Sequence, residues 1–129
     1  MKTLKLILII IITFPFISFI PLSKNENDKK LVGIWKGFEI DKQIEGVEKH
    51  WIVQRFSNGK YVIMFTAKQD CEINTFTEKG KWWTNGNVFY EKSDTSDTTD
   101  SYNYKITDDL VIHFKSLTTD YEFDDYKLD

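Results

Sequence analysis

The segment Trp51–Tyr61, WIVQRFSNGKY, decides the fold of this chain. It places Asn58-Gly59 between two apolar runs, and Asn-Gly in that setting is the strongest short signal for a β-hairpin. Side chains alternate between the two faces of a strand, so Arg55 shares a face with Trp51 and Val53. The segment therefore predicts an antiparallel hairpin that carries an arginine among apolar side chains.

The same pattern continues on both sides of this hairpin. Asn85-Gly86 repeats the turn signal, and polar turns are expected at residues 78–80 and 107–109. Runs rich in Val, Ile, Tyr, Phe and Trp lie between the turns. They predict strands at 33–41, 48–56, 60–67, 71–77, 80–84, 87–92, 101–106, 110–116 and 120–127, two of which can be one bent strand.

Alternation in the C-terminal half predicts a sheet with one buried face. One face collects Tyr102, Tyr104 and Ile106; the next strand collects Leu110, Ile112 and Phe114, and the last collects Tyr121 and Phe123. Hairpin-linked strands of this kind suit an all-β fold, an antiparallel up-and-down β-barrel of about eight strands, whose closure removes free edges. A short helical turn is expected within residues 25–32, with Asn27 or Asp28 as its N-cap.

Residues 1–23 form a separate unit in the sequence. Two lysines in Met1–Lys5 precede the uncharged run Leu6–Ile20, which is the layout of a secretory signal peptide. The alternative is a retained N-terminal membrane anchor, although the run falls short of the ~20 residues that span a bilayer and Pro15 interrupts it. We therefore expect a signal or anchor helix at 1–23, an exported domain at 24–129, and a periplasmic or extracellular location.

Composition excludes several classes of protein. The chain has 129 residues, one Cys, and 17 basic against 20 acidic residues. It is therefore a single domain without an internal disulfide, and its charge does not indicate a nucleic-acid partner. Residues 91–129 hold 4 basic and 11 acidic residues. This acidic third is a solvated surface, a docking surface for a basic protein partner, or a cation site.

Residues with catalytic or metal-binding chemistry are few. Cys71, His50 and His113 are the only thiol and imidazoles, and their spacing matches neither a nucleophile–base pair nor a zinc site. Aspartates recur every three residues in the loop 93–100, at Asp94, Asp97 and Asp100, without the pattern of a calcium loop. We expect no enzyme activity, no metal and no cofactor.

Gly33-Ile34-Trp35, just after the expected helical turn, resembles the Gly-x-Trp signature of lipocalins. The Trp51–Tyr61 hairpin and the pair Tyr102 and Tyr104 are similar to small bacterial lipocalin-like domains. The resemblance implies that Gly33 and Trp35 form a structural plug at the closed end of a barrel. The late arginine that stacks on this Trp in lipocalins is absent, and a lysine such as Lys127 would take its place.

The resemblance and the surplus of rings together predict a small apolar or amphipathic ligand at the barrel mouth. The expected contacts are Trp51, Arg55, Tyr61, Trp83, Tyr90 and Tyr102. Arg55 would either hold a ligand carboxylate or form a structural salt bridge. Bulky rings fill a small barrel, so we expect a shallow pocket. The alternative is a protein-interaction module, an inhibitor or immunity-type protein, that uses the acidic third. Membrane contact is expected only through residues 1–22, if they are retained.

Overall fold

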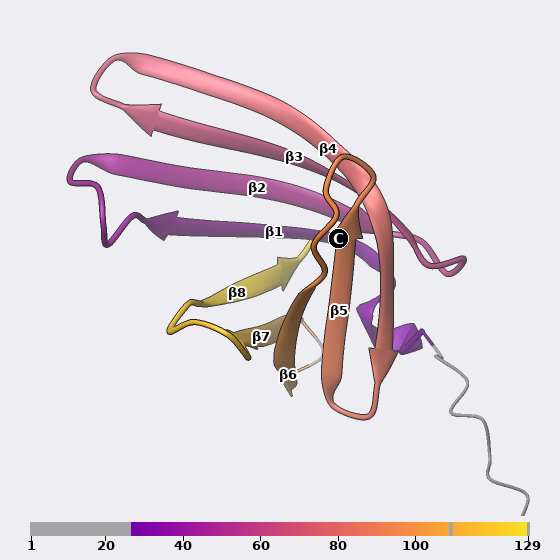
Figure 1. The fold of residues 1–129 in the computed structure, drawn as a ribbon. Coiled ribbons are helices and arrows are strands. Elements are labelled where there is room, and N and C mark those ends of the chain that lie inside the picture. The colour runs from indigo at the N-terminus through magenta and orange to yellow at the C-terminus, as the bar shows by residue number, and fades with distance from the viewer. Residues whose placement is uncertain (1–26, 109, 129) are drawn as a thin grey trace, which may run out of the picture.

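A computed structural model describes residues 27–108 and 110–128 of the chain, so the expected signal or anchor helix lies outside the described residues. Eight antiparallel strands close into one barrel in the order β1 to β8 (Figure 1). A 3-10 turn, η1 (Lys29–Leu31), precedes them. The strands are β1 (Gly33–Ile40), β2 (Val47–Arg55), β3 (Lys60–Gln69), β4 (Glu72–Asn85), β5 (Val88–Ser93), β6 (Asp100–Asp108), β7 (Val111–Ser116) and β8 (Glu122–Lys127).

The barrel closes between its first and last strands. Trp35 of β1 is the register partner of Lys127 of β8, and Lys36 is the partner of Tyr126. All the remaining strand pairs join strands that are consecutive in the sequence. The prediction of an all-β, up-and-down antiparallel barrel is therefore confirmed.

The Asn-Gly turns form as predicted. Gly59 and Gly86 adopt the left-handed backbone that such turns require, with φ of +80° and +60°. The Phe56 amide donates to the Lys60 carbonyl at 2.8 Å and closes the β2–β3 turn. Local turn chemistry thus sets both hairpins.

The turn predicted at residues 78–80 is wrong, because β4 continues through it. Glu78 pairs with Ile63 of β3, and Gly80 pairs with both Tyr61 and Ser93. A Cβ at Gly80 would lie only 2.1 Å from the Lys92 carbonyl oxygen of β5. The glycine therefore permits close strand contact within one long strand, and it does not mark a reversal of the chain.

One end of the barrel is closed by η1. Asp28 caps this turn, and its backbone N–H donates to Thr84 Oγ1 at 3.1 Å while its carboxylate accepts from the Tyr104 hydroxyl at 2.8 Å. Beneath it, Trp35 is 1% exposed, and its indole N–H donates to the Leu31 carbonyl at 3.0 Å. Lys127 Nζ lies 5.8 Å from the centre of the Trp35 ring. This lysine therefore occupies the position beside the Trp that an arginine has in lipocalins, as the resemblance implied.

The opposite end carries the β1–β2, β3–β4, β5–β6 and β7–β8 loops. Here β1 to β4 extend well past β5 to β8 (Figure 1). The core lies nearer the closed end, where most of the fully buried rings gather: Trp35, Trp82, Phe89 and Phe114. The inner faces of the long strands are therefore partly uncovered at the open end.

Candidate functional site

A buried ion pair lies inside the barrel. Arg55 Nη2 is 2.7 Å from Asp125 Oδ2, and the two side chains are 3% and 0% exposed. The Trp51 indole N–H donates to the other Asp125 oxygen at 2.7 Å. The guanidinium also lies 5.0 Å from the Phe89 ring centre and 5.1 Å from that of Phe114. Of the two interpretations given for Arg55, this geometry supports a structural salt bridge.

The ion pair leaves part of Arg55 without hydrogen bonds. Its Nε and Nη1 atoms are buried and have no partner among residues 27–108 and 110–128. The carboxylate of Glu91, a half-buried residue on β5, has no side-chain hydrogen bond or ion pair within the same described residues. Burial raises the pKa of Glu91 to about 7, and the positive charge of Arg55 opposes that shift. The interior therefore holds a carboxyl group that titrates near neutrality.

The charge of this carboxyl group acts on two inner tyrosines, Tyr61 and Tyr102. The Tyr61 hydroxyl donates to Glu78 Oε1 at 2.7 Å. Burial, and next the hydrogen bond to Glu78, raise the pKa of Tyr61 far above its usual value. Burial, and next the negative charge of Glu91, do the same for the pKa of Tyr102. Both phenols thus stay neutral and can act as hydrogen-bond donors.

An aromatic wall runs from the core toward the open end along β2, β3 and β4. The Trp51 and Phe65 rings are 6.3 Å apart and nearly parallel, and Phe65 stacks on Phe76 at 5.0 Å. Phe123 of β8 meets Trp51 edge-on at 5.6 Å. Phe76 lies on the inner face as the register partner of Phe65, yet it is 55% exposed. The wall thus ends in a ring open to solvent.

A pocket of about 390 Å³ lies at the same end, between the β1–β2 and β7–β8 loops. It is lined by Glu39, Ile40, Asp41, Lys42, Gln43, Lys49, Thr119, Asp120, Tyr121 and Glu122. Burial, and next the charge of Glu39, raise the pKa of Tyr121 well above its usual value. The charged side chains that line the pocket are four carboxylates and two amines.

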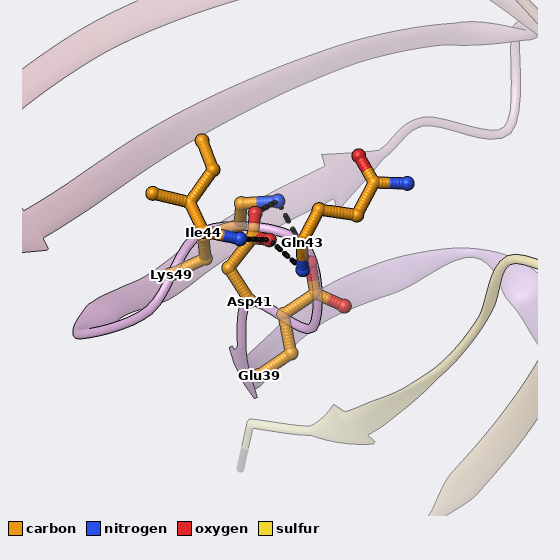
Figure 2. Close-up of polar contacts among 5 residues, drawn as sticks. All are labelled: Glu39, Asp41, Gln43, Ile44 and Lys49. Carbon is orange, nitrogen blue, oxygen red and sulfur yellow. Dashed lines mark hydrogen bonds and ion pairs between the residues drawn. The ribbon is translucent and has the colours of Figure 1, made fainter.

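The β1–β2 loop at this pocket is held by Asp41 (Figure 2). Asp41 accepts hydrogen bonds from the backbone N–H groups of Gln43 at 2.7 Å and Ile44 at 2.9 Å, and it pairs with Lys49. Lys49 also lies 3.2 Å from Glu39. The hydrogen bond from Lys49 is the main cause that lowers the pKa of Asp41 to about 2. Lys49 is thus shared between two carboxylates, which fixes one wall of the pocket.

The structure separates the six predicted ligand residues into two groups. Trp51, Arg55, Tyr61 and Tyr102 lie on the inner face and are buried. Trp83 and Tyr90 stack on each other on the outer face, 5.5 Å apart with a 7° angle between their rings. Trp82 takes the inward position next to Trp83, and alternation along β4 then directs Trp83 outward. The predicted set therefore does not converge on one site.

Sequence reasoning missed four inner residues: Phe65, Phe76, Glu91 and Asp125. Phe123 was expected on the buried face, but not at the ligand site. Alternation within β3 could have placed Phe65 with Tyr61. Phe76 lies in the predicted strand 71–77, which follows the strand 60–67, but its pairing with Phe65 depends on the register of the two strands, which the sequence left open. The partner of Arg55 had no local signal, since Asp125 lies 70 positions away.

The residues considered for catalysis are scattered over the surface. Cys71 is a free, exposed thiol in the β3–β4 turn, where the chain reverses. His50 packs on Phe38 on the outer face, and His113 Nδ1 is 2.7 Å from Asp124. The described residues contain no group of three His, Cys, Asp or Glu side chains placed to hold a metal ion.

No protein-family model matches the chain, and a search of curated proteins finds no match. Within the part of the chain that the structure describes, no helix is long and apolar enough to cross a bilayer. The eight-stranded closed barrel is consistent with a calycin-like fold. Any statement about function therefore depends on the geometry of the barrel itself.

Proposed function

We propose that this protein is an exported lipocalin-like binding protein that takes a small apolar or amphipathic ligand at the open end of its barrel. One observation carries the proposal. Phe76 lies on the inner face, stacks on Phe65, and leaves 55% of its surface exposed. An exposed ring that continues a buried aromatic wall offers apolar contact to a ligand at little cost in rearrangement.

The polar groups near the open end favour some ligands over others. The charge of Arg55 is already balanced by Asp125, and the guanidinium is 3% exposed. A ligand carboxylate would also meet Glu39, Asp41, Asp120 and Glu122 around the pocket, against Lys42 and Lys49. Like charges oppose binding, so the ligand is neutral or basic at its polar end rather than acidic.

The proposal is tested by titration with N-phenyl-1-naphthylamine, a neutral apolar probe whose fluorescence rises in apolar sites. Phe76→Ser should weaken probe binding about tenfold, since about 1.5 kcal/mol of apolar contact is lost. Phe38→Ser is the matched control, because Phe38 is 51% exposed on the outer face. Dodecanol should displace the probe at lower concentration than dodecanoate does.

Two results would contradict this proposal. One is probe binding that is unchanged in a folded Phe76→Ser variant. The other is an equal loss in the Phe76 and Phe38 variants, which would place the probe on the outer surface. Circular dichroism of both variants confirms that the barrel is intact.

The alternative, a protein-interaction module that uses the acidic third, has less support from the geometry. Asp125 is buried with Arg55, and Asp124 pairs with His113. These two acidic residues of β8 are therefore engaged within the barrel and do not contribute free charge to a common docking surface.

A further inference from the structure

Lysines form a row across the outer face of the barrel. Lys60 of β3 is the register partner of Lys81 of β4, which is in turn the partner of Lys92 of β5. Lys79 lies on the same face, two residues along β4. None of the four forms an ion pair within residues 27–108 and 110–128. Like charges directly opposite on a sheet repel, so the row is unfavourable until an anion covers it.

Apolar side chains continue along the same outer face from the row toward the open end. Phe38, Ile52 and Met64, on β1, β2 and β3, are 51%, 42% and 45% exposed. Ile34, Ile40, Val62 and Ile73 are also exposed at outward positions of β1, β3 and β4. A groove of about 410 Å³ lies between β8 and β3, lined in part by Lys36, Phe38, Ile52 and Met64. Cationic and apolar groups therefore share one surface.

Acidic side chains are nearly absent from this surface. Glu48 is the acidic residue at the outward positions of β1 to β5, and it lies 3.7 Å from Lys68. Other carboxylates of these strands point inward, as Glu78 does toward Tyr61. Although the whole chain has a net charge of −3, this side of the barrel is basic and partly apolar.

The chain enters the barrel beside this surface. Asn27, the first described residue, donates from its side chain to the Ser57 carbonyl at 3.2 Å, in the turn that leads to Lys60. Six residues, 21–26, separate the apolar run Leu6–Ile20 from Asn27. Six residues span at most about 20 Å. Any bilayer that received the apolar run, even briefly during export, would therefore lie close to the lysine row.

We propose that the outer face of β1 to β5 binds the surface of an anionic lipid bilayer. Lipid phosphates neutralise Lys60, Lys79, Lys81 and Lys92, and the exposed apolar side chains enter the headgroup region. Trp83 and Tyr90, stacked on the same face one rung beyond Lys81 and Lys92, lie at the interface. Aromatic rings with a polar edge favour this position.

Trp83 gives a direct test on the full chain. The other three tryptophans are 1%, 5% and 1% exposed inside the barrel, and residues 1–26 contain none. Vesicles of phosphatidylglycerol with brominated acyl chains should quench Trp83, and vesicles of brominated phosphatidylcholine should not. The Trp83→Phe variant gives the quenching of the three buried tryptophans, and this value is subtracted from the quenching of the native chain. Quenching should disappear in 1 M salt, where screening shortens to about 3 Å.

Two charge-reversed variants identify the face. The triple variant Lys60→Glu/Lys81→Glu/Lys92→Glu should weaken vesicle binding, measured by Trp83 quenching, at least about 100-fold. Each change replaces an attraction to the anionic surface by a repulsion. Lys42→Glu/Lys105→Glu/Lys115→Glu makes the same change in net charge elsewhere on the surface and should retain quenching. Circular dichroism confirms that both variants are folded.

The proposal fails if vesicles sediment with the protein while Trp83 stays unquenched, because residues 1–26 alone would then hold the barrel at the membrane. It also fails if both triple variants lose quenching equally, or if phosphatidylcholine quenches as well as phosphatidylglycerol. Binding of a single-stranded oligonucleotide that needs the three lysines, without vesicle binding, would assign the surface to nucleic acid and overturn the proposal.

Discussion

Arg55 and Asp125 lie 70 positions apart in the sequence and form a 2.7 Å ion pair in the barrel interior. The pair joins β2 to β8, the two strands that flank β1, on the inner face of the barrel, and Trp51 holds the second carboxylate oxygen of Asp125. A buried pair of this kind contributes little net stability, but loss of one member leaves an uncompensated charge. A single substitution at either of these two residues should therefore strongly lower the stability of the barrel.

Asp125→Asn should destabilise the barrel by about 3–5 kcal/mol, because Arg55 keeps its charge without a counterion. Asp124→Asn is the matched control: Asp124 pairs with His113 on the outer face, and an exposed pair contributes about 1 kcal/mol or less. Urea denaturation measures both. The double change Arg55→Met/Asp125→Leu should be less harmful than Asp125→Asn, and a larger loss in the double variant would show that the charge is not the cause.

Trp35→Ala should lower the free energy of unfolding by about 3–5 kcal/mol, because a large ring with 1% exposure is removed near the closed end. Trp35→Phe should cost less, since most of the ring volume remains and only the hydrogen bond to Leu31 is lost. The same denaturation assay applies. A loss below about 1 kcal/mol for Trp35→Ala would remove the plug role that the resemblance implies.

Stability should fall as pH rises from about 4.5 to about 7 through Glu91. Its pKa is raised from 4.5 to about 7 by burial, so the folded state binds a proton more tightly than the unfolded chain does. Between these values the folded state holds more protons, and the free energy of unfolding decreases by roughly 1–3 kcal/mol. Above about pH 8, where Glu91 is ionised in both states, this contribution is constant.

Glu91→Gln should remove that slope, because an amide does not titrate in this range. Unfolding by urea at several pH values from 4.5 to 8 compares the variant with the native chain. Asp97→Asn, in an exposed loop, serves as the control and should leave the slope unchanged. An identical pH profile for Glu91→Gln and the native chain would assign the dependence to other groups.

Gly37→Ala should destabilise the barrel by about 1–3 kcal/mol through overpacking. A Cβ at Gly37 would lie 2.0 Å from the Cε2 and Cζ2 atoms of the Trp51 ring, so the indole must move. Its hydrogen bond to Asp125 would then be disturbed. Near-ultraviolet circular dichroism should change with the position of Trp51. A variant with native stability and spectrum would show that the ring has room to shift.

Much of the architecture could be predicted from the sequence because its causes are local. Asn58-Gly59 and Asn85-Gly86 fix two turns through backbone conformation, and alternation within each strand fixes which residues share a face. Asp28 as a helical cap follows from the same kind of short-range chemistry. These features depend on residues within a few positions of one another, so the sequence determined them by itself.

Only the tertiary structure decided the site. Alternation makes Trp82 and Trp83 face opposite ways but does not say which is inside; the register of β4 against β3 and β5 decides that. That register also joins two predicted strands into one and brings Phe76 onto Phe65. Closure of β8 on β1 brings Asp125 to Arg55. Each contact joins distant strands, and its physical cause is the packing of the closed barrel, which no local pattern encodes.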